Sequence, residues 1–234
     1  ISPHMVNVRE RIRINNEVIS SGEFHSISQE VYERSNDQEV SYFEALTAVA
    51  SLYFKRQGVD IALFEVGLGG RLDSTNVHDA NYSIITSIGL DHVEYLGTDL
   101  QGILLEKAGV FRSDQHSWVQ LTQLSLRTKV QLLAQEKKTR LHLQELTHLG
   151  QARGHFYRNQ YLAEAAAKKI CDDLGFAVPQ RLWVDTIQSH DWDGRIQKVD
   201  DHVWSQYFAE VYLDGAHNPE SFTELLNFSK AKLS

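Results

Sequence analysis

The chain is organised around an apolar run that ends in a carboxylate and a glycine turn, within Val59–Asn76 (VDIALFEVGLGGRLDSTN). Residues 61–66 are apolar except for Glu65, and a short apolar run flanked by glycines predicts a buried parallel strand. An ionised carboxylate at the end of a buried strand is costly unless a cation meets it, and the glycines let backbone or ligand come close. This combination indicates a metal or phosphate site at Glu65.

Two further apolar runs also end in polar residues. Tyr82–Ile88 is rich in β-branched residues and leads into His92, and Phe208–Leu213 leads into Asp214. Strands that alternate with helices in this way predict right-handed crossovers and a parallel sheet. Ligands of such sheets bind beyond the carboxyl ends of the strands. We therefore predict an α/β fold in which Glu65 and His92 lie at the ligand-binding edge.

Helices are predicted where apolar residues recur at helical spacing behind a capping signal. Ser41 and Glu44 match a capping box, and Thr98 and Gln101 match a second. The expected helices are Ser20–Glu33, Ser41–Gln57, Thr98–Ala108, Tyr157–Leu174, Arg181–Ser189 and Pro219–Lys232, the last with Asn218 as its N-cap.

Two remaining stretches have weaker patterns. Val6–Ile14 alternates apolar with charged residues, which predicts a half-exposed edge strand with solvated arginines, closed by a turn at Asn15-Asn16. The stretch Ser113–Gly150 has weak periodicity and is predicted only as mixed helix and strand.

Composition narrows the class of protein. Hydrophobic residues make up 42% of the chain and charged residues 23%, as in an ordinary soluble globular protein. A formal net charge of -8 argues against a nucleic-acid binder. The single cysteine, Cys171, excludes an internal disulfide and fits a reducing compartment. Because no apolar run approaches about 20 residues, we expect a cytoplasmic protein without nucleic-acid or membrane partners.

Several motifs together resemble the folylpolyglutamate synthase/dihydrofolate synthase family of the Mur ligase superfamily. EVGLGGRLDSTN (65–76) resembles the family signature, and the other matching blocks occur in the family's order over nearly the whole chain. These blocks are SPHMVNVRERIRIN (2–15), SYFE (41–44), TSIGLDHVEYLG (86–97), EKAGVFR (106–112), WDGR (192–195) and LDGAHNP (213–219).

The resemblance implies an ATP-dependent ligase that joins L-glutamate to dihydropteroate, tetrahydrofolate or both. ATP phosphorylates a carboxylate and the amine of glutamate attacks the acyl phosphate, so catalysis consists mostly of positioning and charge neutralisation. It also implies a parallel-sheet, Mur ligase-type central ATPase domain over residues 1–200, the start of a smaller C-terminal α/β domain over 201–234, and a monomer.

The resemblance assigns roles to particular residues. It implies that Ser2, Glu65 and His92 hold Mg²⁺, and that Lys107 is the lysine that the family carbamylates. A solvated helix lysine is the alternative for Lys107.

The resemblance also names residues for the two larger substrates. Tyr42 and Phe43 would face the flat pterin heterocycle, while Asn159, Arg195, Asp214 and the nearby His217 would contact ATP. Each of the last group could instead be a surface ion or a cap. The full set implied for the pterin substrate is Ser41, Tyr42, Phe43, Glu44, Leu72, Asp73 and Ser74.

One family motif does not occur in the sequence. The family binds the ATP phosphates in a glycine-rich P-loop, G-x-x-G-K-[ST], upstream of the segment that matches Ser2-Pro3-His4. We therefore expect an incomplete ligase without the P-loop portion and most of the C-terminal domain. The alternatives are a catalytically inactive relic or pterin-binding module and, less in keeping with the residue spacing, a metal-dependent hydrolase.

Overall fold

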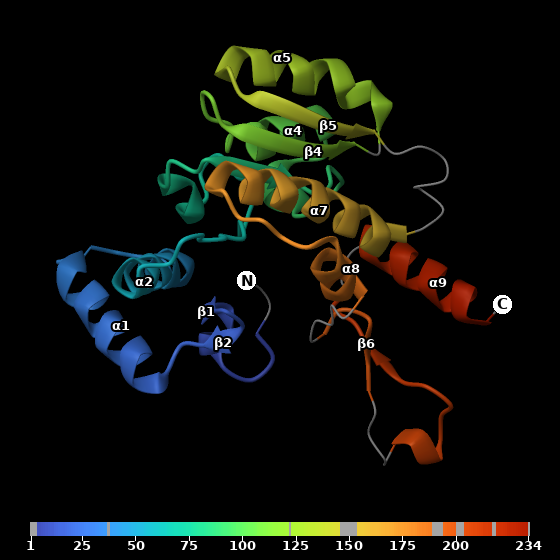
Figure 1. Ribbon diagram of the computed structural model, residues 1–234, viewed down its shortest axis with the longest axis horizontal. Coiled ribbons are helices and arrows are strands. Elements are labelled where there is room, and N and C mark those ends of the chain that lie inside the picture. The colour runs from blue at the N-terminus through green and yellow to red at the C-terminus, as the bar shows by residue number, and fades with distance from the viewer. Residues whose placement is uncertain are drawn as a thin grey trace. The chain divides into compact units, whose positions relative to one another are not determined.

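The computed structural model divides the chain into two compact units, residues 1–79 and residues 80–234 (Figure 1). The residues that the structure describes are 4–36, 38–121, 123–145, 154–188, 194–199, 204–216 and 219–233. None of the helices in these ranges is long and apolar enough to cross a membrane. The predicted division into 1–200 and 201–234 stays a prediction.

Two helices and a short hairpin form the smaller unit. The helices are α1 (Ser21–Ser35) and α2 (Tyr42–Gln57), the antiparallel hairpin is β1 (Arg13–Ile14) and β2 (Glu17–Val18), and the 3-10 helices are η1 (Val8–Arg11) and η2 (Ser74–Val77). Ile12, Ile19 and Ile27 pack against Leu46 and Tyr53 to form its core.

Capping residues set the helix boundaries in this unit. Ser20 caps α1, and Ser41 and Glu44 form the predicted capping box of α2, with the Ser41 N–H donating to Glu44 Oε2 over 2.8 Å. Gly58, with φ +61°, ends α2 in the left-handed conformation that glycine adopts readily. Both helix predictions are confirmed.

The predicted edge strand at Val6–Ile14 is wrong over most of its length. Asn7 and Glu10 form a capping box that starts η1, so the backbone turns where an extended strand was expected. The arginines are half-buried and not solvated: Arg9 donates to the Ile19 carbonyl, and Arg13 donates to the Glu10 carbonyl. The predicted turn is confirmed, because Asn15 and Asn16 both have positive φ.

The predicted buried strand at 61–66 is also wrong. These residues pair with no strand in the described part of the chain, and Ile61 and Leu63 are 50% and 78% exposed. A strand is stabilised by the ladder of hydrogen bonds to its neighbours. Without such a neighbour in the described chain, this apolar segment forms no strand, and all of its residues except Phe64 are exposed.

A three-stranded parallel sheet is the centre of the larger unit. Its strands are β3 (Tyr82–Ile85), β4 (His116–Leu121) and β5 (Arg140–Glu145) in the order β3-β4-β5, with Tyr82 opposite His116 and His116 opposite Arg140. The α/β fold with a parallel sheet is therefore confirmed.

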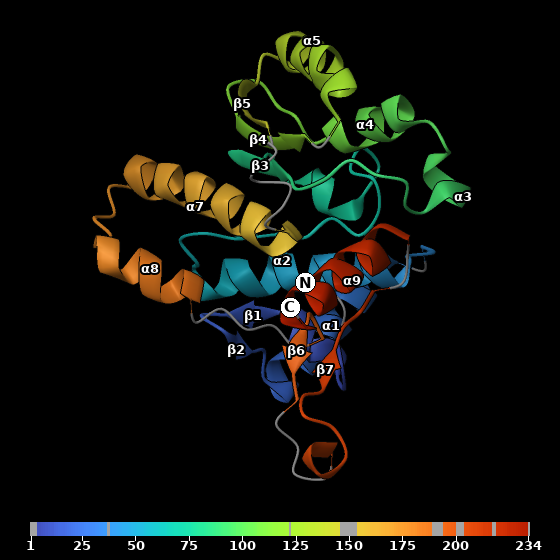
Figure 2. The same cartoon turned by 90° about the vertical axis from the view of Figure 1, so that its right-hand side faces the viewer.

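Helices cover both faces of this sheet (Figure 2). One face packs against α4 (Leu100–Ala108) and α5 (Arg127–Lys137), and the core there includes Val119 and Leu121 of β4. The other face packs against α7 (Gly154–Leu174), where Trp118 meets Leu162 and Ala166. Alternate residues of β4 therefore face different layers. Because β4 is the central strand of the sheet, all of its residues after His116 are buried.

The remaining elements of this unit are short, apart from α9. They are α3 (Val93–Leu96), η3 (Leu124–Leu126), α8 (Gln180–Gln188), β6 (Gln197–Lys198), η4 (Trp204–Gln206), β7 (Tyr212–Leu213) and α9 (Pro219–Leu233).

Two predictions in this region need correction. The strand expected at Phe208–Leu213 is only β7, which pairs antiparallel with β6. Asp99, and not Thr98, caps α4, because its carboxylate accepts the N–H groups of Gln101 and Gly102. The helices expected at Tyr157–Leu174 and Pro219–Lys232 are confirmed, and Asn218 lies outside the described residues.

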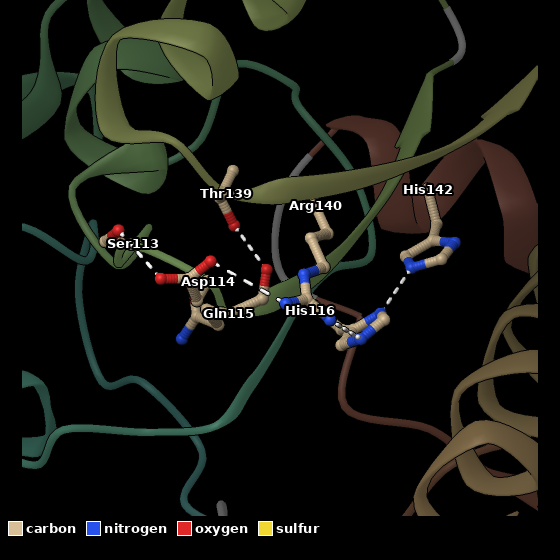
Figure 3. Close-up of polar contacts among 7 residues, drawn as sticks. All are labelled: Ser113, Asp114, Gln115, His116, Thr139, Arg140 and His142. Carbon is tan, nitrogen blue, oxygen red and sulfur yellow. Dashed lines mark hydrogen bonds and ion pairs between the residues drawn. The ribbon is translucent and has the colours of Figure 1, made fainter. Parts of the chain in front are cut away.

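Two histidines meet at the amino end of the sheet (Figure 3). His116 Nδ1 and His142 Nε2 are 2.8 Å apart, and Arg140 Nη1 lies 3.4 Å from His116 Nε2. Since the guanidinium can only donate, His116 Nε2 accepts from Arg140 and His116 Nδ1–H donates to His142. Burial lowers the pKa of His116 and the pKa of His142, and the nearby charge of Lys169 lowers both pKa values further.

We predict that this pair makes the stability of the fold depend on pH. Because the folded-state pKa values lie below the ordinary value of about 6.5, the unfolded chain binds more protons as the pH falls through that value. The free energy of unfolding should therefore decrease from about pH 7.5 to about pH 5. In His142→Gln, which keeps polar atoms at this position but does not titrate, the decrease measured by urea unfolding should be smaller. Equal decreases in the two proteins would contradict the prediction.

Candidate functional site

A cavity of about 290 Å³ opens at the carboxyl ends of β3 and β4 in the larger unit. Residues that follow the strands, one side chain of α4, and parts of α7 and α9 line it. The lining residues are Thr86, Ser87, Gly89, Asp91, Lys107, Gln120, Arg158, Asn159, Arg195, Ile196, Asp214, Gly215, Ala216, Ser221, Glu224 and Leu225. This is the edge of a parallel sheet at which ligands bind.

Four residues that the sequence assigned to catalysis or to ATP meet in this cavity. Lys107 comes from the last turn of α4, Asn159 from the first turns of α7, and Arg195 and Asp214 from the segments beside β6 and β7. They span more than a hundred positions of the sequence, and the fold alone brings them together.

Asp214 joins the two segments that carry the charged residues. One carboxylate oxygen accepts the Ile196 N–H over 2.7 Å and the other accepts the Ala216 N–H over 2.8 Å. The Gly215 N–H donates to the Gly194 carbonyl over 2.8 Å. A Cβ atom at position 215 would lie 2.3 Å from Arg195 Nη1, so a larger residue there would displace the guanidinium from its present position.

An ion pair that sequence reasoning missed lies in the same cavity. Arg158 Nη2 and Glu224 Oε1 are 2.7 Å apart, and the side chains are only 11% and 19% exposed. Arg158 adjoins Asn159, but nothing in the sequence indicates that a residue of α9 would neutralise it. Gln120 was missed as well, because it lies in the stretch without a clear pattern.

His92 lies beside the cavity and is not among the residues that line it. It precedes α3 with a positive φ of 48°, and its N–H donates to Asp91 Oδ1 over 2.9 Å. Asp91, the residue before it, does line the cavity.

In the smaller unit, Asp73 organises the glycine turn. Its Oδ2 accepts the N–H groups of Gly67 and Leu68, each over 2.9 Å, and its Oδ1 accepts the N–H and hydroxyl of Thr75. Four hydrogen bonds to one carboxylate fix the loop that carries Ser74 and Leu72.

Of the residues assigned to the pterin substrate, the structure brings Phe43, Asp73 and Ser74 together. The Phe43 ring lies so close to Gly67 that an added Cβ would be 2.8 Å from it. Thr47 donates its hydroxyl proton to the Phe43 carbonyl, so the Ser74 hydroxyl donates to Thr47 Oγ1 over 2.9 Å.

The other four residues of that set are placed differently. Ser41 and Glu44 cap α2, and the Ser41 hydroxyl and N–H lower the pKa of the Glu44 carboxyl. Leu72 is 80% exposed. Tyr42 lines a separate cavity of about 490 Å³ between α1 and α2, together with Phe24, Ser28 and Val49 among others.

The residues assigned to Mg²⁺ come from different parts of the chain. Glu65 belongs to the smaller unit, where it is exposed, and His92 belongs to the larger unit. Ser2 and His217 lie outside the described residues. Across the ranges that the structure describes, no three His, Cys, Asp or Glu side chains are grouped so that they could hold a metal ion.

We predict that Asp73 holds the glycine turn in place. In Asp73→Ala, the Gly67 and Leu68 N–H groups lose their acceptor, and their amide hydrogen exchange should accelerate by on the order of tenfold. Asp60→Ala, which removes an exposed carboxylate of the same unit, is the matched control and should leave these two rates unchanged. Unaltered exchange in Asp73→Ala would show that the turn is fixed by other contacts.

Known proteins similar to this chain were found by sequence and by structure, although no protein-family model matches it. A dihydrofolate synthase/folylpolyglutamate synthase of Buchnera aphidicola from Acyrthosiphon pisum is 32% identical over 94% of this chain and 55% of its own length. The Escherichia coli enzyme of the same name is 41% identical over 49% of this chain and 27% of its own length. The chain spans about half the length, or less, of these curated relatives.

Solved structures agree with the sequence comparison. Escherichia coli FolC in complex with DHPP and ADP has a TM-score of 0.82 and 30% identity over 99% of this chain and 57% of that protein. A bifunctional folylpolyglutamate synthase/dihydrofolate synthase with Mn, AMPPNP and L-glutamate bound has a TM-score of 0.81 and 28% identity over 99% of this chain and 58% of that protein. The collinear motifs, the α/β fold and these similarities together show that the chain belongs to the folylpolyglutamate synthase/dihydrofolate synthase family.

Proposed function

We propose that this chain is the central part of an ATP-dependent ligase that joins L-glutamate to dihydropteroate, tetrahydrofolate or both. One observation carries the proposal: the cavity at the carboxyl ends of β3 and β4 gathers Lys107, Asn159, Arg195 and Asp214, which the sequence motifs had named independently. The relatives bear the same activity in their names, and two of the similar structures contain adenine nucleotides.

The cavity of the larger unit is the proposed ATP site. Arg195 supplies a guanidinium for phosphate oxygens, which it binds through paired, charge-assisted hydrogen bonds. Asp214 keeps the Arg195 segment and the β7 segment together by accepting the Ile196 N–H. Lys107, on the wall of the same cavity, is the proposed site of carbamylation, and His217 is proposed as a further nucleotide contact.

The glycine turn of the smaller unit, with the first turn of α2, is the proposed site for the pterin substrate. The Phe43 ring offers an aromatic face to a flat heterocycle, and Ser74 and Leu72 flank it on the loop that Asp73 fixes. Tyr42 lies in a different cavity of this unit, so we assign it to the border of the site. The capping residues Ser41 and Glu44 act by holding the helix end in place.

The proposed reaction has two balanced steps. An oxygen of the substrate carboxylate attacks the γ-phosphorus of ATP, the bond to the bridging oxygen breaks, and ADP leaves. The amine of glutamate then attacks the acyl carbon, loses a proton, and expels inorganic phosphate as the amide forms. The residues of this chain bind and orient the reactants, which is the main requirement of phosphoryl transfer.

We also propose that a divalent metal, with Mg²⁺ as the natural one, accompanies the nucleotide. Ser2, Glu65 and His92 are its proposed ligands, and Mg²⁺ favours oxygen donors and retained water. When bound, the metal would neutralise phosphate charge. A cytoplasmic, monomeric enzyme without nucleic-acid or membrane partners completes the proposal, in keeping with the single Cys171 and the net charge of -8.

The decisive test is ATP-dependent incorporation of labelled glutamate into dihydropteroate and into tetrahydrofolate. It should be run with the 234-residue chain and with the same chain extended upstream through any encoded P-loop. We expect incorporation by the extended protein, because a P-loop supplies the backbone N–H groups that bind the triphosphate. Pterin binding without incorporation in either protein would overturn the ligase proposal in favour of a binding module.

We predict that Arg195 contributes directly to nucleotide affinity. Arg195→Ala should weaken ADP binding, measured by calorimetry, by about tenfold to a hundredfold, because it removes charge-assisted hydrogen bonds to phosphate. Arg181→Ala, which removes a guanidinium that is 91% exposed on α8, is the matched control and should bind ADP as the parent does. Equal affinities in all three proteins would remove Arg195 from the site.

A further inference from the structure

Gln120 is a buried amide at the point where β4 reaches the cavity. Its side chain is only 2% exposed and it lines the cavity wall. Its Nε2 donates to the Thr86 carbonyl over 2.8 Å and to Asn159 Oδ1 over 3.4 Å. Its Oε1 is buried and has no hydrogen-bond partner among the described residues. Gln120 therefore connects the end of β3 to the start of α7.

Stability does not explain a glutamine at this position. A buried acceptor without a partner destabilises the fold, and an apolar side chain of similar size would avoid that cost. Gln115, just before the same strand, shows the contrast. Its Oε1 accepts from Ser83, Ser117 and the Arg112 N–H, and its Nε2 donates to the Ala80 carbonyl. Gln115 is thus satisfied by the fold, whereas Gln120 keeps beside the cavity an acceptor that no described residue pairs with.

We propose that Gln120 is a positioning residue that fixes the carboxamide of Asn159, so that the cavity accepts a 6-aminopurine and rejects a 6-oxopurine. The inference rests on the proposed function, because it takes Asn159 as a nucleotide contact. It adds a residue that the family motifs do not include and a reason for the choice of base.

The geometry of the two amides gives the selectivity. A carboxamide oxygen has two lone pairs, and Gln120 occupies one of those on Asn159 Oδ1. The second can accept a hydrogen from the exocyclic amine of adenine while Asn159 Nδ2 donates to a ring nitrogen, the pairing that an asparagine makes with adenine. A 6-oxopurine places an oxygen opposite Oδ1, and the Gln120 contact prevents the amide from turning to meet it.

The charges of the cavity place the base on this side. Arg195 supplies a cation suited to phosphate, and Arg158 next to Asn159 is neutralised by Glu224 over 2.7 Å. Gln120 and Asn159 are uncharged and cannot neutralise phosphate. A nucleotide has one anionic end and one neutral, planar end with N–H groups. The amide pair matches the neutral end.

The test is a comparison of ADP with inosine diphosphate, binding to the intact chain by calorimetry. The parent protein should bind ADP at least about tenfold more tightly, since a bidentate amide–base pair discriminates by about 1–3 kcal/mol. Gln120→Met keeps the length of the side chain and removes its polar atoms. In this variant the ratio of the two affinities should fall to within about twofold, whereas general weakening of the site would lower both affinities and leave the ratio unchanged.

Gln115→Met is the matched control. It removes a glutamine that is 3% exposed beside the same strand and has more hydrogen bonds in the described chain than Gln120. It should lower the melting temperature and keep the ADP preference of the parent. If circular dichroism shows that Gln120→Met is unfolded, Gln120→Asn is tested in its place. The amide of the asparagine variant is one methylene too short to reach Asn159, so this variant should also lose the preference for ADP.

The outcomes separate the inference from the proposed function. A preference for ADP that disappears only in the Gln120 variant supports the inference. A preference that survives in the Gln120 variant, or equal binding of both nucleotides by the parent, overturns it and leaves the nucleotide site intact. Absence of ADP binding by the folded parent overturns the nucleotide site and the inference together.

Discussion

The parallel pairing of β3 with β4 is the constraint on which the larger unit depends. The register places Ile85 opposite Val119, so the residues that follow, Thr86 and Gln120, reach the same edge of the sheet and are joined by a hydrogen bond of 2.8 Å. The helices on the two faces then bring Lys107 and Asn159 to that edge from opposite layers. A shift of one residue in the register would exchange the faces of β4 and take apart both the core and the cavity.

The two ends of β4 carry different kinds of polar structure. At the amino end, His116 and Gln115 have hydrogen-bond partners from neighbouring strands and loops, and they contribute to the stability of the sheet. At the carboxyl end, Gln120 keeps an acceptor without a partner in the described chain. Buried polar groups that the fold satisfies belong to the scaffold, whereas those that it leaves unsatisfied beside a cavity indicate where a ligand acts.

Local signals were predicted well from the sequence, and pairing between distant segments was not. The capping box of α2 could be identified because an N-cap acts within four residues. The strand expected at 61–66 failed because its apolar pattern says nothing about which strand would pair with it. Motifs named Asn159 and Arg195, but Glu224 and Gln120 enter the cavity only through packing between α7, α9 and β4, which no local pattern encodes.

The contact between Gly67 and Phe43 restricts how this family member can change. The backbone at Gly67 is held by the Asp73 carboxylate on one side and faces the Phe43 ring on the other, where an added Cβ would lie 2.8 Å from the ring. A side chain at position 67 therefore requires the Phe43 ring to move or to be replaced. If residue 67 changes first, the Phe43 ring and with it the proposed pterin site are displaced, whereas a smaller residue at position 43 makes room beforehand.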